Sequence, residues 1–188
     1  MRIKEYVALA NQNDFVTRDF DRFKKEIFKH TLLWEGVSNI SKGGKLHVVP
    51  GDSGGYTIWG IAYNKNKEMF SNFDEFKNLT YEQAAAIAFV RYYKAVQAFV
   101  LPKESQLMYF DMAYNLGVGR AIRLMQRCAG VREDGVIGPM TRSKMKFITE
   151  DCLYQERIGF YNSIVKSKSS LSKFLKGWLN RSKAIKEV

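Results

Sequence analysis

The segment PGDSGGYTIWGI, residues 50–61, decides how this sequence is interpreted. Its first eleven residues hold four glycines and one proline, a density that excludes a regular helix and allows backbone conformations closed to other residues. Upstream, Glu35 ends a predicted helix, and residues 37–49 have the pattern of a small hairpin with a Gly-Gly turn. The sequence therefore predicts an acid at a helix end, a hairpin, and a second acid, Asp52, in a glycine-rich loop.

This arrangement can bring two carboxyl groups to face each other across a cleft, and glycoside hydrolysis needs such a pair. One carboxyl group must donate a proton to the leaving oxygen, and the other must be ionised to activate water or stabilise positive charge. The hydroxyl of Thr57, five residues after Asp52, is suited to holding the attacking water. Glu35, Asp52 and Thr57 are therefore the catalytic candidates, although each alone is equally well explained as a turn former or a solvated side chain.

Three aromatic residues near the acids, Tyr56, Trp59 and Tyr63, are candidates for stacking on sugar rings. Asn115 is a fourth candidate for substrate binding, although capping of a helix end explains it equally well. The sequence leaves open whether the reaction retains or inverts configuration. The carboxyl groups lie about 5–5.5 Å apart in retaining enzymes and about 6.5–9.5 Å apart in inverting ones, and the Thr57 hydroxyl favours inversion.

Most of the remaining sequence has the apolar periodicity of amphipathic helices. A capping box of Thr80 and Gln83 starts one helix, and glycines end others at positions 117 and 130. Pro139 is suited to the first position of a helix that follows the turn begun by Asp134. The fold class is therefore mainly α, with a small β element around the glycine-rich loop.

The 188 residues suit one domain with a small appendage, and the formal net charge is +11. Residues 1–119 hold 15 basic and 13 acidic side chains, whereas residues 120–188 hold 15 basic and six acidic ones. A basic C-terminal third implies an anionic partner, which composition alone leaves as nucleic acid, a lipid surface or a cell-wall polymer. No apolar stretch is long enough for a transmembrane segment, and we expect no signal peptide.

The cysteine and histidine content limits the chemistry further. Cys128 and Cys152 form no CxxC motif, and we expect two reduced, mostly buried thiols. His30 and His47 are the two histidines, too few for the usual zinc ligand sets. The sequence therefore predicts neither a metal site nor a cofactor.

Several motifs together resemble the glycoside hydrolase family 108 lysozymes and the predicted peptidoglycan-binding domain that follows their catalytic part. They are the Glu35-Gly36 pair, residues 52–61 (DSGGYTIWGI), 110–117 (FDMAYNLG), 121–127 (AIRLMQR) and 134–141 (DGVIGPMT). The resemblance covers residues 20–185. It departs from the family pattern at Val37 and Ser53, where Gly and Pro are usual, and in the longer segment between the two acids.

The resemblance implies a lysozyme-like helical fold with a small β-hairpin next to the active-site cleft, and it gives Glu35 the role of general acid. It also implies a catalytic lobe at residues 1–117 and a basic peptidoglycan-binding lobe at 118–188, packed against it. The implied activity is that of a monomeric N-acetylmuramidase of the endolysin type. Such an enzyme would be made in the bacterial cytoplasm and would act on the cell wall after release by a separate factor.

Other functions compete with this one. A non-catalytic cell-wall-binding protein and an exported antibacterial effector are possible on the same fold, although a degenerate enzyme would be expected to lose one of its three catalytic candidates. Nucleic acid is not expected as the partner, because the chain has no helix-turn-helix, zinc or RNA-binding signature. The polyanion that we expect is therefore peptidoglycan together with the anionic bacterial envelope surface.

Overall fold

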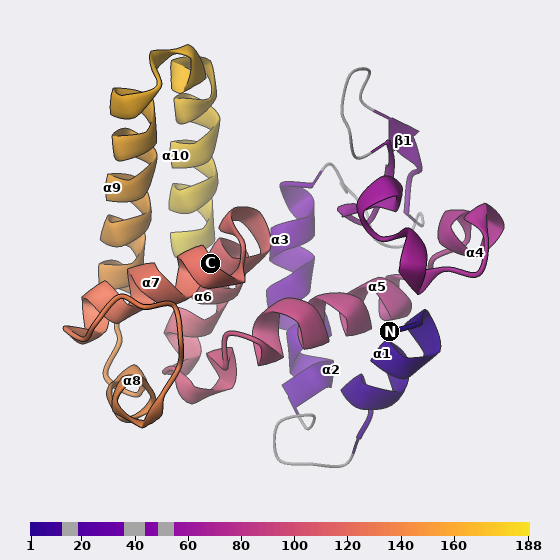
Figure 1. Cartoon of the computed structure of the whole chain (residues 1–188), viewed down its shortest axis with the longest axis horizontal. Coiled ribbons are helices and arrows are strands. Elements are labelled where there is room, and N and C mark those ends of the chain that lie inside the picture. The colour runs from indigo at the N-terminus through magenta and orange to yellow at the C-terminus, as the bar shows by residue number, and fades with distance from the viewer. Residues whose placement is uncertain (13–18, 36–43, 49–54) are drawn as a thin grey trace. The chain divides into compact units, whose positions relative to one another are not determined.

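The computed structural model describes residues 1–12, 19–35, 44–48 and 55–188. Contacts within the chain divide it into two compact units, Met1–Arg91 and Tyr92–Val188, which are described separately below. Helices dominate both units, and the first also holds a three-stranded antiparallel sheet (Figure 1). The predicted fold class, mainly α with a small β element, is confirmed.

Helices of the first unit enclose an aromatic core. They are α1 (Ile3–Ala10), the continuous run of α2 (Phe20–Arg22), η2 (Phe23–Phe28) and α3 (Lys29–Leu33), then η4 (Tyr63–Lys65), η5 (Lys67–Met69), α4 (Phe73–Lys77), α5 (Tyr81–Ala88) and η6 (Phe89–Lys94). The rings of Phe20 and Phe23 pack on Phe89 with centroids 5.2 and 5.1 Å away. The α2–α3 run is thereby joined through ring contacts to the first residue of η6, which continues directly from α5.

The capping box that the sequence predicts is present at the start of α5. The Thr80 hydroxyl accepts a hydrogen bond from the backbone N–H of Gln83 at 3.2 Å, and the Gln83 side chain accepts one from the Thr80 N–H at 2.9 Å. The boundary is predictable from sequence because both partners lie within one turn.

The sheet consists of β1 (His47–Val48), β2 (Tyr56–Ile58) and β3 (Ile61–Ala62), with β2 in the centre. Trp59 and Gly60 join β2 to β3 with φ angles of 54° and 75°, as in the tight turn that matches the twist of a hairpin. The sequence predicts a hairpin over residues 37–49, whose first strand lies outside the described residues. The pairing that the structure describes is between β1 and β2.

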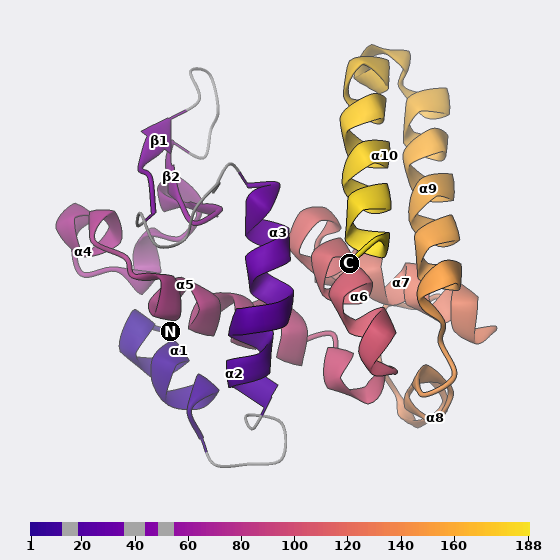
Figure 2. The ribbon, with the colours of Figure 1, turned by 180° about the vertical axis from the view of Figure 1, so that it is seen from behind.

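In the second unit, long helices surround α6 (Lys103–Leu116), whose residues 105–113 are all buried. The others are η7 (Ala98–Val100), α7 (Val118–Ala129), α8 (Pro139–Met145), α9 (Glu150–Ser167), η8 (Ser169–Leu171) and α10 (Ser172–Lys186). α9 and α10 form an antiparallel hairpin, side by side in both views (Figure 2). As predicted, Gly130 ends α7 in the left-handed conformation, and Pro139 takes the first turn of α8.

A buried ion cluster holds three of these helices together. Asp111 of α6 receives Arg181 of α10 through two hydrogen bonds of 3.0 and 2.8 Å, and it lies 2.7 Å from the guanidinium of Arg157 of α9. The side chains of Asp111 and Arg157 are fully buried. Two guanidinium groups therefore share one carboxylate in the interior, and both α9 and α10 depend on this carboxylate of α6 for a charge partner.

A second polar centre organises the turn between α7 and α8. The buried Gln126 side chain donates to the Asp134 carboxylate at 2.8 Å and to the Val136 carbonyl at 3.0 Å, and it accepts from the Gly135 N–H at 2.9 Å. The hydrogen bonds that the Asp134 carboxylate accepts from the Gln126 side chain and from the Val136 N–H hold its pKa below its usual range. The interpretation of Asp134 as a turn residue is confirmed.

Cys128 and Cys152 form a disulfide, with their Cα atoms 5.9 Å apart. The prediction of two reduced thiols is therefore wrong. Cys128 lies near the end of α7 and Cys152 near the start of α9, and these two helices pack against each other. Helix packing brings together two residues that local sequence patterns could not pair.

Among the described residues, no helix combines the length and the apolar character needed to cross a membrane.

Candidate active site

Glu35 lies two residues after α3, with which the helical run ends. Figures 1 and 2 show the end of α3 on the side of the unit where the strands lie. Its backbone N–H donates to the Leu32 carbonyl at 3.0 Å, and the residue is half-buried. Leu32 and Phe28 are buried, so the helix that carries Glu35 is anchored in the core. Glu35 is thus an acid held by a rigid element and open in part to solvent.

The second candidate acid, Asp52, lies outside the described residues. Gly55, which follows that segment, has a φ of +66°, and a Cβ there would lie 2.6 Å from the side chain of Asn64. The positive φ angle favours glycine at this position, and a Cβ there would also require the Asn64 side chain to move.

Thr57 is half-buried in the middle of β2, between His47 of β1 and Ala62 of β3. Side chains alternate along a strand, so Thr57 projects from the face opposite to Tyr56 and Ile58. The structure therefore does not place Tyr56 and Thr57 on the same face of the sheet.

Tyr56 presents an aromatic surface to solvent, because 45% of the residue is exposed. Its ring packs on Phe73 of α4 with centroids 5.1 Å apart. The ring of Tyr63 also contacts Phe73, with centroids 5.0 Å apart. The Phe76 ring packs on Tyr63 with centroids 4.9 Å apart. The structure thus joins Tyr56 and Tyr63 through Phe73 in one aromatic cluster that could stack against a sugar.

Trp59 has a different position, since only 2% of it is exposed. Its indole N–H donates to the Leu79 carbonyl at 2.7 Å, and its ring meets Tyr81 edge-on at 5.6 Å. Burial raises the pKa of the Tyr81 hydroxyl to about 12. The Trp59 ring supports the β2–β3 turn from the core side, and it would have to leave this position to stack on a sugar.

Asn115 belongs to the second compact unit, at the exposed end of α6. Its amide oxygen accepts a hydrogen bond of 2.7 Å from the Tyr161 hydroxyl, which itself accepts one of 3.2 Å from Arg157. The amide oxygen is thereby held toward the buried ion cluster. Asn115 has a structural partner that the sequence did not indicate, and its role in substrate binding stays a prediction.

The second unit also holds a surface hollow of about 450 Å³. Its lining residues are Val100, Pro139, Arg142, Ser143 and Lys146. The Arg142 guanidinium donates to the Gln97 side chain and lies over the Phe99 ring. Apolar walls beside two cations could accept an anionic group.

The described residues contain no group of three or more His, Cys, Asp and Glu side chains placed to hold a metal ion. His30, the second residue of α3, is partly buried, and this burial together with the nearby Lys29 lowers the pKa of its imidazole.

Two family models match the chain in succession. Residues 28–117 match glycosyl hydrolase 108, and residues 120–183 match the predicted peptidoglycan domain. The first match includes Glu35 and the whole sheet, and the second includes α8, α9 and most of α10. The chain therefore holds a region that matches glycosyl hydrolase 108 followed by one that matches the peptidoglycan domain, which confirms the resemblance that the motifs indicated. Together the two matches support a glycoside hydrolase that acts on peptidoglycan.

A solved structure, that of Brucella abortus SagA, is similar to this one. The two chains are 27% identical, the similarity covers 85% of this chain and 93% of the SagA chain, and the TM-score is 0.64. The lysozyme-like helical fold with its small sheet is thereby supported along most of the chain. No curated protein matched the sequence.

The sequence did not identify Phe73, whose ring packs on the exposed Tyr56. A signal was available, because Phe70, Phe73 and Phe76 recur every three residues across the start of α4. Such spacing predicts rings on one side of a helix, although it does not say which ring they would support.

Proposed function

We propose that this chain is an N-acetylmuramidase, a lysozyme that cleaves the β-1,4 bond between N-acetylmuramic acid and N-acetylglucosamine, with Glu35 as the general acid. The observation that carries the proposal is the half-buried Glu35 at the end of a core-anchored helix, inside the region that matches glycosyl hydrolase 108. A general acid needs such a fixed position, because proton donation to the leaving oxygen requires hydrogen-bond geometry.

Asp52 and Thr57 are proposed to hold the attacking water on the opposite side of the sugar from Glu35, which gives inversion of configuration. Tyr56 projects from the other face of β2. It is therefore proposed to stack on a sugar unit away from the cleaved bond, together with Tyr63 across Phe73.

Residues 1–117 are proposed as the catalytic lobe and residues 118–188 as the lobe that holds peptidoglycan. The hollow beside Arg142 and Lys146 lies in the second lobe, and its cations suit the carboxylates of the wall peptides. We further propose that the protein acts as a monomer, made in the bacterial cytoplasm and active on the wall after release by a separate factor, as in phage lysis.

The test of the catalytic assignment is loss of turbidity when purified protein is added to bacterial cells stripped of their outer membrane. Glu35→Gln is expected to abolish clearing while circular dichroism shows an unchanged fold. Glu26→Gln is the matched control, because Glu26 is an exposed acid on the same helical run, 3.6 Å from Arg22. Clearing by Glu35→Gln at the parent rate would refute the assignment.

Mass spectrometry of digested peptidoglycan tests the cleaved bond. Reducing muramic-acid ends are expected. Reducing glucosamine ends, freed peptides or 1,6-anhydromuramic ends would each identify a different enzyme and overturn the muramidase proposal. Absence of any product with intact binding to sacculi would favour a non-catalytic wall-binding protein.

A further inference from the structure

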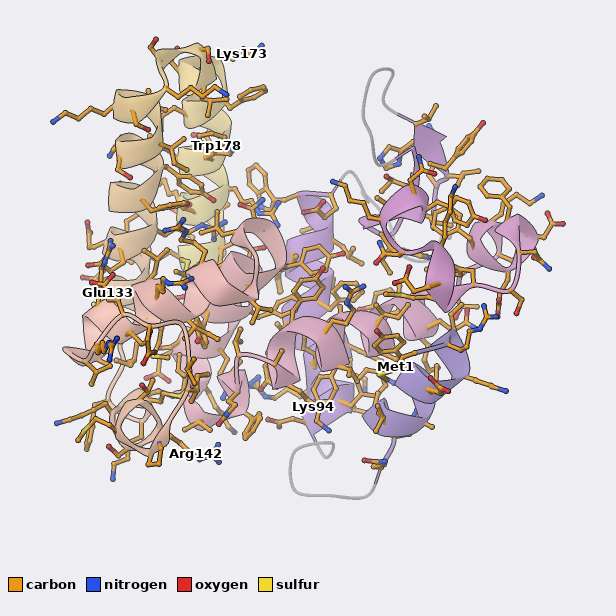
Figure 3. All side chains as sticks on the ribbon, in the orientation of Figure 1. Met1, Lys94, Glu133, Arg142, Lys173 and Trp178 are labelled. Carbon is orange, nitrogen blue, oxygen red and sulfur yellow. A yellow bond between two sulfur atoms is a disulfide. The ribbon has the colours of Figure 1, made fainter. Side chains whose placement is uncertain are left out.

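The far end of the α9–α10 hairpin has an unusual composition. We define the hairpin tip as residues 164–176, which comprise the last turn of α9, η8 and the start of α10. This segment reads IVKSKSSLSKFLK and contains four lysines and no acid, and the whole stretch 157–186 contains no Asp or Glu. The tip is thus a purely cationic end of a hairpin that extends from the second unit (Figure 3).

The four tip lysines are exposed, and no acidic partner for them is found among the described residues. They are Lys166, Lys168, Lys173 and Lys176. Two other cations of α10 differ in having acidic partners, because Arg181 binds the buried Asp111 and Lys186 binds Asp151. The tip therefore offers positive charge that the protein itself does not neutralise.

Apolar surface accompanies this charge. Phe174 is 47% exposed, and the Lys173 ammonium lies 5.0 Å from the centre of its ring. Phe174 stacks on Trp178 at 5.9 Å, and Trp178 stacks on the buried Tyr161 at 5.0 Å. Figure 3 shows Lys173 at the tip and Trp178 further along α10. The aromatic stack thus runs from the core of the unit to an exposed ring at the tip.

Aliphatic side chains extend this apolar surface. Half-buried residues at the tip are Ile164, Val165, Leu171 and Leu175. A soluble polyanion would use only the lysines, whereas a bilayer surface uses both features, because cations meet the headgroups and apolar side chains enter the boundary below them.

We propose that the hairpin tip is a docking surface for a bilayer that carries anionic headgroups. The lysines contact the headgroups, and Phe174 with its aliphatic neighbours inserts at the boundary with the acyl chains. The hairpin lies at the surface without crossing the membrane. This proposal is independent of the muramidase proposal, since it concerns neither Glu35 nor the sheet.

The test is co-sedimentation of the full chain with vesicles of phosphatidylcholine, with and without phosphatidylglycerol. Binding is expected only with the anionic lipid. The pair Lys173→Gln and Lys176→Gln is expected to weaken the partition coefficient by about 25-fold, at about fivefold for each lysine near the surface. The matched pair Lys4→Gln and Lys65→Gln removes the same charge elsewhere and is expected to change binding far less.

Phe174→Ser tests insertion. It is expected to weaken binding to anionic vesicles by about tenfold or more, since burial of a Phe ring is lost. Phe147→Ser is its matched control, because Phe147 is also exposed and also lies under a lysine, at 4.9 Å from Lys146.

Equal binding to neutral vesicles, or equal losses in the tip variants and their controls, would overturn the proposal. So would loss of binding to purified sacculi by the tip variants with vesicle binding intact, because the tip would then be a wall contact. Glu35→Gln is expected to bind vesicles like the parent, so failure of the muramidase proposal would leave this result unchanged.

Discussion

Removal of the Cys128–Cys152 disulfide is expected to lower the free energy of unfolding of the second unit. The size of this change depends on the length of the loop that the bond closes. The bond closes a loop over a sequence separation of 24 residues. In the chain-entropy model, the unfolded state loses about 11.6 cal/mol/K for a loop of this length, which corresponds to about 3.4 kcal/mol at 25 °C. The expected change is a substantial fraction of the total stability of a typical domain, which is about 5–15 kcal/mol.

The perturbation is the double variant Cys128→Ala with Cys152→Ala, compared with the oxidised parent in urea unfolding. The free energy of unfolding is expected to fall by about 3 kcal/mol, and the parent treated with dithiothreitol is expected to behave like the variant. The single variant Cys152→Ala serves as the control for packing, because it breaks the bond but keeps the Cys128 side chain.

Two results would refute this reasoning. Alkylation of the folded, non-reduced parent at both cysteines would show that no bond is present. A double variant within about 1 kcal/mol of the oxidised parent would show that the loop closed by the bond is already restricted in the unfolded chain.

Three further predictions concern the ion cluster, the pH response and the aromatic cluster. Asp111→Asn leaves Arg157 buried without its counter-charge and is expected to cost about 3–5 kcal/mol of unfolding free energy in urea. The pKa of His30 is lowered in the folded protein, so the unfolded chain binds more protons at pH values just below the ordinary histidine pKa of 6.5. The contribution of His30 to stability is therefore full above pH 6.5 and is lost as the pH falls below it. A His30→Gln variant should show a smaller drop in melting temperature between neutral and mildly acid buffer. Phe73→Leu removes the ring that packs on Tyr56 and is expected to raise KM for peptidoglycan with kcat nearly unchanged, at a cost of about 1 kcal/mol, as measured by initial rates of peptidoglycan hydrolysis.

Features that depend on neighbours in the sequence could be predicted. The Thr80–Gln83 capping box, the glycine that ends α7 and the proline that starts α8 each involve groups within one helical turn. Their physical cause is local, since backbone groups at a helix end need partners close by. The mainly helical fold follows from these signals together with the apolar periodicity.

Features that depend on tertiary packing could not be predicted. Asp111 lies 46 residues from Arg157 and 70 from Arg181, and nothing in the sequence pairs them. In the candidate site, Tyr56 and Trp59 belong to one short motif and are both aromatic. Tyr56 is exposed and Trp59 is buried, because of the register of β2 and the tight turn that follows it. The register and the turn are features of the folded chain that the motif alone does not give.

The structure shows that several cations in the basic C-terminal third are paired with acids of the same unit. Arg157 and Arg181 are paired with the buried Asp111, and their role is structural. Arg127 is paired with Glu133 at 2.7 Å and Glu156 at 3.5 Å. Charges that are paired within the protein contribute little to attraction at a distance, so the field that an anionic surface meets comes largely from unpaired cations such as those of the hairpin tip. Attraction of the second unit to an anionic surface is therefore expected to depend on these unpaired cations and to weaken as the salt concentration rises.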